Sequence, residues 1–169
     1  MQVFTIEGGK PLNGTVVPSG NKNAALPLLA ACLLTDQPVV LHNIPLIRDV
    51  MSMRNLMESL GVSFDEVEKH TWKIHAENVK PSSLDPDLCK KIRASILLAG
   101  PMAARCGEIK LSPPGGDVIG HRRLDTHFLA LNQLGIETVF DKDLTFRTKK
   151  LVGADILLDE ASVSATENA

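Results

Sequence analysis

The sequence contains few aromatic residues and few cysteines. It has no tyrosine, one tryptophan and five phenylalanines among 169 residues, so the core must consist mainly of Leu, Ile, Val, Ala and Met. The three cysteines, Cys32, Cys89 and Cys106, form no CxxC pair and have no histidine at metal-ligand spacing. This scatter disfavours both a disulfide framework and a zinc site, and the five histidines show no HExxH pattern. We therefore expect no metal and no cofactor.

A strong charge of either sign and a long apolar run are also lacking. The net charge is −2, which argues against a nucleic-acid partner. No apolar run approaches the roughly 18 residues of a membrane span, and MQVFTIEGGK lacks the regions of a signal peptide. With 44% hydrophobic and 22% charged residues, the chain is typical of a globular protein, which we expect in the cytoplasm with no membrane partner.

The first half of the chain predicts an α/β unit at about residues 21–80. Residues 1–20 predict a hairpin, because VFTI and TVV flank the turn-rich GGKPLNG. A small-residue helix over 22–34, a strand in PVVLHN and a second helix in RDVMSMRNLMESLG follow. The second helix has one apolar face and ends at Gly61, and VSFDEV and HTWKIHA then predict two strands. That face consists of Val50, Met53, Met57 and Leu60.

The same order of elements recurs at about residues 88–150, after the linker PSSLDPDL. A small-residue helix in IRASILLAGPMAA precedes a strand in GEIKLS, a loop and a helix in LDTHFLALNQLG. Leu124, Phe128, Leu131 and Leu134 form the inward face of that helix, and IETVF and LTFRT predict two strands. The helix-ending glycines of the two units lie about 74 residues apart, which indicates an internal repeat.

A third unit starts at about residues 155–169. ADILLD predicts a strand, and SVSATENA is similar to PSGNKNAA near the start of the chain. Alignment of the two places Asn168 and Ala169 against Asn23 and Ala24. A helix that stops in its first turn leaves its apolar face unbuilt. We therefore expect the chain to be a fragment, with residues 21–169 forming an incomplete domain.

Two predicted helix starts carry groups that suit an anion. Gly20-Asn21-Lys22-Asn23 combines free N–H groups, the positive end of a helix dipole and an ammonium group, although a solvated lysine beside an ordinary cap is the alternative. Arg93 occupies the corresponding place in the second unit. A guanidinium is unfavourable there unless an anion accompanies it, and a surface salt bridge is the alternative.

The stretch PPGGDVIGHRRLDTH, residues 113–127, cannot continue a strand or a helix. Such a loop inside a compact unit is commonly functional, because it can close over a ligand. Asp117 could donate or accept a proton once dehydrated, and His121, Arg122 and Arg123 suit a diphosphate. A surface loop with a charged helix entry is the alternative.

Four motifs, SGNKNAALPLLAACLL, KKIRASI, SPPGGDVIGHRRLDTH and DEASVSATENA, occur in this order and at this spacing. Together they resemble the enolpyruvyl transferase family, and within it the UDP-N-acetylglucosamine 1-carboxyvinyltransferases of bacterial peptidoglycan synthesis. The resemblance covers the whole chain and about the first two-fifths of such an enzyme. It implies an inverse α/β barrel built from βαβαββ units, here two units plus the start of a third. The hairpin at 1–20 would pack with the other domain.

The resemblance implies transfer of enolpyruvyl from phosphoenolpyruvate to the 3′-hydroxyl of UDP-N-acetylglucosamine, with release of phosphate. Cell-wall biogenesis, cell shape, the cell cycle and cell division would then depend on it. Asp117 would be the proton donor, and Lys22 and Arg122 would be catalytic. Substrate would also contact Asn23 and Arg93. The nucleotide would contact Arg123, Leu124, Asp125, Thr126, Ser162, Val163 and Ser164.

Two positions depart from the common family pattern. Asp117 stands where the loop usually has a cysteine, and Arg123 stands where a proline usually follows the arginine. A carboxylic acid can donate a proton but cannot form a thioether, so the resemblance implies resistance to fosfomycin, an epoxide that alkylates that cysteine.

Two alternatives stay open at this point. The chain could be a relative of the shikimate-pathway enolpyruvyl transferase, or a non-catalytic remnant that binds a nucleotide sugar. The resemblance places the catalytic base and further arginines in the missing C-terminal part of the same enzyme. We therefore expect the fragment alone to be inactive.

Overall fold

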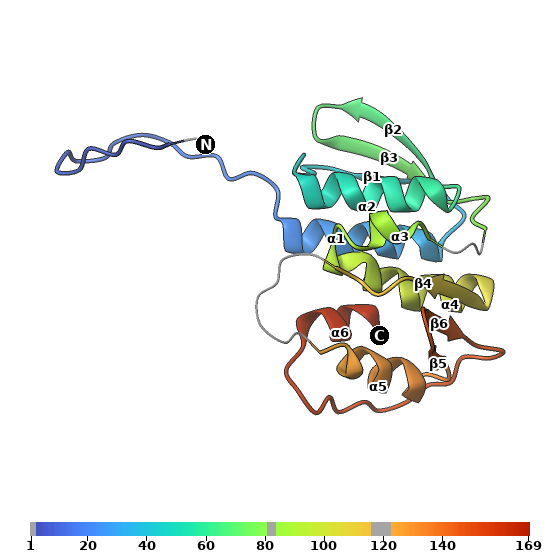
Figure 1. Ribbon diagram of the computed structural model, residues 1–169. Helices are drawn as coiled ribbons and strands as arrows, with labels where there is room; N and C mark the ends of the chain where they lie inside the picture. Colours follow the sequence, from blue (N-terminus) through green and yellow to red (C-terminus); the bar gives the residue numbers. More distant parts are fainter. Residues whose placement is uncertain (1–2, 81–83, 116–122) are drawn as a thin grey trace.

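The computed structural model describes residues 3–80, 84–115 and 123–169, which form two similar halves (Figure 1). In the first half, α1 (Lys22–Ala31) continues into the 3-10 turn η1 (Cys32–Leu34) and leads to the sheet. The other elements are β1 (Val39–Leu41), α2 (Arg48–Ser59), β2 (Ser63–Glu68) and β3 (Thr71–His75). The sheet is antiparallel with the order β1-β3-β2, and Ile74 of β3 pairs with both Val39 and Phe64.

The second half repeats this order. It begins with the short helix α3 (Pro86–Cys89), and its sheet is antiparallel with the order β4-β6-β5. The predicted helix at the start of this unit consists of a 3-10 segment, η2 (Arg93–Leu98), followed by α4 (Ala99–Cys106). The other elements are β4 (Glu108–Leu111), α5 (Asp125–Gln133), β5 (Glu137–Phe140), β6 (Leu144–Arg147) and α6 (Val163–Asn168).

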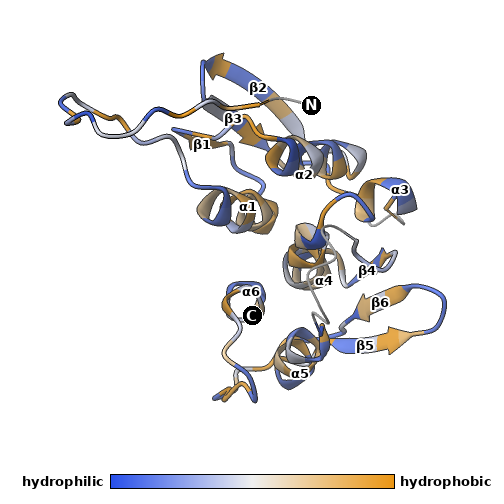
Figure 2. Cartoon of the chain, turned by 60° about the vertical axis from the view of Figure 1, so that its left-hand side comes forward, coloured by the Kyte–Doolittle hydropathy of each residue, from blue (hydrophilic) through white to orange (hydrophobic). Residues whose placement is uncertain are grey.

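The core follows the apolar periodicity of the sequence. All four residues of the predicted α2 face, from Val50 to Leu60, are at most 1% exposed, which confirms that face. The middle strand of each sheet contributes one large aromatic side chain, Trp72 from β3 and Phe146 from β6, and both are fully buried. The outer strand β2 is mainly hydrophilic (Figure 2), and all of its residues except Phe64 are exposed.

Arg105 joins the two halves through main-chain carbonyl groups. It extends from α4 of the second half, and its Nη1 donates hydrogen bonds to Leu33 O at 2.9 Å and Thr35 O at 3.0 Å. Its Nη2 donates to Glu77 O at 3.2 Å. All three acceptors belong to the first half. One guanidinium group thus provides hydrogen bonds to carbonyl groups at the end of η1 and just after β3, where regular structure ends.

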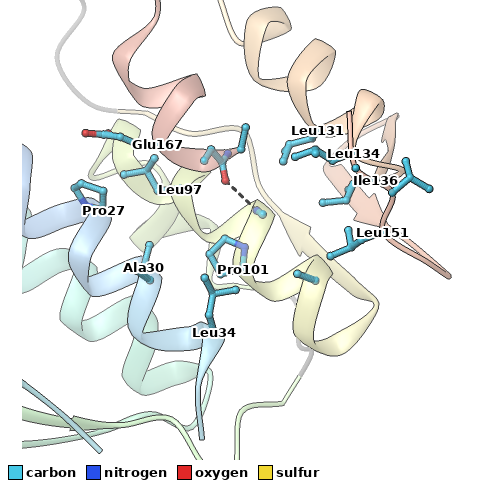
Figure 3. Close-up of a pocket in the computed structure, with 17 residues that line it drawn as sticks. Pro27, Ala30, Leu34, Leu97, Pro101, Leu131, Leu134, Ile136, Leu151 and Glu167 are labelled. Atoms are coloured by element: carbon cyan, nitrogen blue, oxygen red, sulfur yellow. Dashed lines mark hydrogen bonds between the residues drawn. The ribbon is translucent and has the colours of Figure 1, made fainter. Parts of the chain in front are cut away.

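The short helix α6 is fastened to the second half by the side chain of Asn168. Its Oδ1 accepts a hydrogen bond from Gly100 N at 3.0 Å (the dashed line in Figure 3), and its Nδ2 donates to Ile96 O at 3.0 Å. The backbone of α6 lies so close to α4 that a Cβ on Gly100 would be 2.5 Å from Asn168 O. Only glycine therefore permits this approach.

Three expectations from the sequence differ from the structure. The described residues 3–20 contain no strand, and Val3, Phe4 and Ile6 are 81–88% exposed along an arm that leaves the body of the protein (Figure 1). An isolated two-stranded hairpin is marginally stable, and this arm has no third strand or helix to pack on. ADILLD forms no strand either, and the expected linker contains α3, which Asp85 caps by accepting a hydrogen bond from Asp87 N at 2.7 Å.

We predict that Gly100→Ala destabilises the protein by about 2 kcal/mol, because the added methyl group overpacks the contact with Asn168. Helix propensity alone would instead stabilise an alanine in α4 by about 1 kcal/mol, so the sign of the change is diagnostic. Gly153→Ala is the matched control, since a Cβ there meets nothing within 4 Å. Chemical denaturation of both variants measures the difference, and a Gly100→Ala protein as stable as the control would contradict the packing argument.

Candidate functional site

The turn before α1 presents Lys22 and Asn23 at the helix start. Asn21 is the cap, and its Oδ1 accepts hydrogen bonds from Asn23 N at 2.7 Å and Ala24 N at 3.3 Å. A Cβ on Gly20 would be 1.8 Å from Asn43 O, so the turn is packed tightly on the segment after β1. Two of the N–H groups expected to be free are thus already used by the cap. Of the groups expected to suit an anion, the Lys22 ammonium group is therefore the main one that the cap does not use.

Lys22 is held by a carboxylate from the neighbouring helix. Its Nζ lies 2.9 Å from Oδ2 of Asp49 in the first turn of α2. Both side chains are partly exposed, at 45% and 38%, so the pair contributes little to stability. The ion pair nevertheless holds the Lys22 ammonium group at one position. An anion there can replace Asp49 as the partner of Lys22.

A cavity of about 720 Å³ brings together six residues that the sequence singled out. They come from three distant segments: Lys22 and Asn23, Arg93, and the turn Ser162–Ser164. Lys91 adds a third cation, and Asp49 and Glu167 are the carboxylates of the lining. Burial raises the pKa of the Glu167 carboxyl group. The other described residues of the lining are apolar: Leu26, Pro27, Ile92, Ala94, Ile96, Leu97 and Ala161.

Arg93 connects this cavity to the start of α5. Its Nη2 donates a hydrogen bond to Arg123 O at 2.7 Å. Arg123 in turn pairs with Asp125, and its hydrogen bond to that carboxyl group holds the pKa of Asp125 below its usual range. Residues 123–126 do not line the cavity, and Thr126 is only 3% exposed. The structure therefore places this second predicted set beside the cavity, with Arg93 as the link.

The two described ends of the glycine-rich loop contact one segment. At one end, Gly115 N donates to Cys89 O at 3.2 Å, and a Cβ on Gly115 would be 2.0 Å from Lys90 O. At the other end, Arg123 accepts the hydrogen bond from Arg93. Both ends thus attach to residues 89–93, which also contribute to the cavity. Asp117, His121 and Arg122 lie outside the described residues.

His127 is a residue of this region that the sequence reasoning did not select. It is 1% exposed, and its two ring nitrogens lie 3.1 Å from Ser164 Oγ and 3.2 Å from Asn168 Nδ2. Burial, with a smaller contribution from the positive charge of Arg93, lowers the pKa of His127 to about 4. The signal was present in the sequence, because His127 lies three residues after Leu124 and four before Leu131, on the predicted inward face.

A second cavity of about 440 Å³ is mainly apolar (Figure 3). Pro27, Ala30 and Leu34 line one side, and Leu131 of α5 and Leu134 directly after it line the opposite side. Among the described residues that line it, Glu167 is the one with an ionisable side chain. This lining suits apolar packing rather than the binding of a charged substrate.

Within the described residues, no group of three or more His, Cys, Asp and Glu side chains is arranged to hold a metal ion. In the same residues, no helix is both long and apolar enough to cross a bilayer.

The two repeated halves have the fold of the enolpyruvyl transferases. A solved structure of EPSP synthase from Acinetobacter baumannii superposes with a TM-score of 0.70 at 16% identity, over 92% of this chain and 36% of that chain. The chain belongs to the EPSP synthase (3-phosphoshikimate 1-carboxyvinyltransferase) family, whose model matches residues 6–169. The predicted fold class and the resemblance to the enolpyruvyl transferases are thereby confirmed.

Two curated relatives are much more similar in sequence. UDP-N-acetylglucosamine 1-carboxyvinyltransferase of Bradyrhizobium diazoefficiens is 56% identical over 166 residues, which cover 98% of this chain and 38% of the relative. The protein of the same name from Treponema denticola is 55% identical over 169 residues, which cover 100% of this chain and 40% of the relative. The chain thus spans about two-fifths of the length of these relatives.

We predict that His127 makes the stability of the protein depend on pH. Its folded-state pKa, about 4, lies below the ordinary value of 6.5, so the unfolded chain takes up the proton first as the pH falls. The contribution is fully present above pH 6.5 and is lost as the pH falls toward 4, by about 3 kcal/mol in total.

His127→Gln keeps hydrogen-bonding groups but does not titrate. Unfolding free energies of the two proteins at pH 7 and pH 4.5 should therefore show a smaller loss on acidification for the variant. Equal losses would mean that His127 is not held neutral in the folded protein.

Proposed function

We propose that this chain is part of an enzyme that transfers enolpyruvyl from phosphoenolpyruvate to the 3′-hydroxyl of UDP-N-acetylglucosamine and releases phosphate. The observation that carries the proposal is the single cavity formed by Lys22, Asn23, Arg93 and the turn Ser162–Ser164. The names of the relatives at 55–56% identity support it. Because the chain spans about two-fifths of those relatives, the proposal concerns the protein at its natural length.

The cations of the cavity would bind the phosphoenolpyruvate. Its phosphate and carboxylate groups carry negative charge, and pre-positioned cations stabilise them together with the charge that develops during transfer. The hydrogen bond to Arg123 O directs the Arg93 guanidinium group toward the start of α5. The ion pair with Asp49 holds the Lys22 ammonium group at the cavity. We infer that the phosphate competes with Asp49 for Lys22. Arg122 would add a further cation at the end of the loop.

Asp117 would supply the proton of the first step. In its protonated form it gives that proton to the methylene carbon of phosphoenolpyruvate, while the sugar oxygen forms a bond to the neighbouring carbon. The proton of the sugar hydroxyl passes to a base, which the resemblance places beyond residue 169. The Asp117 carboxylate then takes a proton back from the new methyl group as phosphate departs. This restores the double bond, so the substituent arrives on the sugar as enolpyruvyl.

The nucleotide end would lie near α5 and α6. We propose that the turn Ser162–Ser164 contacts the nucleotide and that Arg123, Leu124, Asp125 and Thr126 hold the uridine part. Thr126 is buried and Leu124 packs against the core, so their contribution would come from the backbone. Arg123 and Asp125 are exposed enough to reach a ligand with their side chains.

A second candidate function is the shikimate-pathway transfer, which the description of the matching family favours. The two differ in the acceptor, since shikimate 3-phosphate contains no nucleotide. The finer expectations, namely a role in cell-wall synthesis and division and a cytoplasmic location, remain predictions.

We predict that the protein at its natural length releases phosphate from phosphoenolpyruvate when UDP-N-acetylglucosamine is present and not when shikimate 3-phosphate replaces it. A coupled phosphate-release assay measures both reactions, with each substrate omitted in turn as the control. The 169-residue chain alone should give no turnover. Release with shikimate 3-phosphate would favour the second candidate, and release with neither acceptor would favour a non-catalytic binding protein.

A further prediction concerns the acid. Asp117→Asn should abolish turnover at natural length while UDP-N-acetylglucosamine still binds, because an amide cannot donate the proton at the required acidity. Asp155→Asn, at an exposed position, is the matched control and should keep full activity.

Asp117→Cys should restore a nucleophile, and fosfomycin should then add to it, whereas the unchanged protein should remain unmodified. Intact-mass measurement detects the adduct. Near-normal turnover of Asp117→Asn, or a fosfomycin adduct on the loop of the unchanged protein, would contradict this role of Asp117.

A further inference from the structure

The orientation of the Asn168 side chain follows from two main-chain groups. Gly100 N–H can only donate, so the atom 3.0 Å from it must be the amide oxygen. Ile96 O can only accept, so the atom 3.0 Å from it must be the amide nitrogen. The side chain is 7% exposed and held at both ends. The two ends of its amide group are thereby distinguished by their partners.

This orientation determines which nitrogen of His127 carries the proton. The same Asn168 Nδ2 lies 3.2 Å from His127 Nδ1, and an amide nitrogen can only donate. Nδ1 must therefore accept and be unprotonated. In the neutral ring the proton is then on Nε2, which lies 3.1 Å from Ser164 Oγ and donates to it. The low pKa of His127 agrees with a neutral ring near pH 7.

Ser164 is consequently left with its hydroxyl hydrogen to donate. Its oxygen accepts from His127, and in the parts of the chain that the structure describes Ser164 Oγ has no other hydrogen-bond partner. Ser164 is half-buried and lines the 720 Å³ cavity, which also contains Lys91 and Arg93. A hydroxyl group that already accepts a hydrogen bond is a stronger donor, because successive hydrogen bonds polarise one another.

We propose that Asn168 and His127 are positioning residues that hold the Ser164 hydroxyl group as a hydrogen-bond donor to a phosphoryl oxygen of the nucleotide bound in this cavity. The opposite tautomer of His127 would take up the Ser164 hydrogen and leave oxygen lone pairs facing the phosphate. The proposal rests on the proposed function for the identity of the ligand. The hydrogen-bond chain from Gly100 to Ser164 does not depend on it.

The first test is the tautomer of His127 in the ligand-free protein at its natural length. Long-range ¹H–¹⁵N NMR at pH 7 distinguishes Nε2–H, Nδ1–H and the doubly protonated ring. We expect Nε2–H for His127. Either of the other two forms would overturn the proposal. Asn168→Asp replaces the donor with a carboxylate, which accepts from Nδ1–H, so the variant should lose the Nε2–H form.

The second test is the affinity for UDP and for UDP-N-acetylglucosamine, measured by calorimetry. Ser164→Ala should weaken the binding of both ligands by about threefold to tenfold, the equivalent of one hydrogen bond. Ser164→Thr keeps the hydroxyl group and should restore most of the affinity. Loss of affinity for UDP-N-acetylglucosamine alone would place the contact on the sugar and contradict the assignment to a phosphoryl oxygen.

A double-mutant cycle separates positioning from a general loss of structure. Asn168→Asp should weaken UDP binding when residue 164 is serine and have no further effect in the Ser164→Ala background. Equal effects in both backgrounds would make Asn168 merely structural. If Asn168→Asp fails to fold, the wild-type tautomer and the Ser164 variants still decide.

Failure of the proposed function gives a different result. A wild-type protein that binds neither UDP nor UDP-N-acetylglucosamine contradicts the proposed function, whereas unchanged binding by Ser164→Ala contradicts this inference alone.

Discussion

The close contact between Asn168 and the backbone of Gly100 is the interaction on which the site depends most. It brings α6 against α4 and places the turn Ser162–Ser164 opposite α1 and η2, so that three distant segments share one cavity. A single amide group also holds Ile96 and His127. The absence of a side chain at residue 100 is thus as important as the presence of one at residue 168. The contact between Gly100 and Asn168 holds α6 against α4 and η2 in the second half.

The sequence predicted most elements of the body of the fold, because they follow from local patterns. The apolar positions of α2 recur at intervals of three and four, and every one of them is buried. The expectations that were wrong depend on contacts that no local pattern contains. The β-branched residues of the first 20 positions suit strands, but a hairpin without a neighbouring sheet gains too little. The segment ADILLD is apolar in the same way and pairs with no strand of the described chain.

The site was predictable in part for the same reason. Lys22 and Arg93 are recognisable because each stands at the start of a helical segment, and the structure brings both into the same cavity. His127 was not selected from the sequence, and on an apolar helix face its type alone does not point to a site. Its significance comes from Ser164 and Asn168, which lie 37 and 41 residues away in the chain. No spacing in the sequence relates these three residues.

The burial of Trp72 also makes the first half of the chain separately observable. It is the one tryptophan in the sequence, and it packs edge-on against Phe64 with the Arg54 guanidinium 5.2 Å from its ring centre. The tryptophan fluorescence of this chain therefore originates in the sheet β1-β3-β2, and the second half of the chain contributes no indole emission. Light emitted by this one side chain thus reports the integrity of the first half, while the network around Asn168 requires a probe of its own.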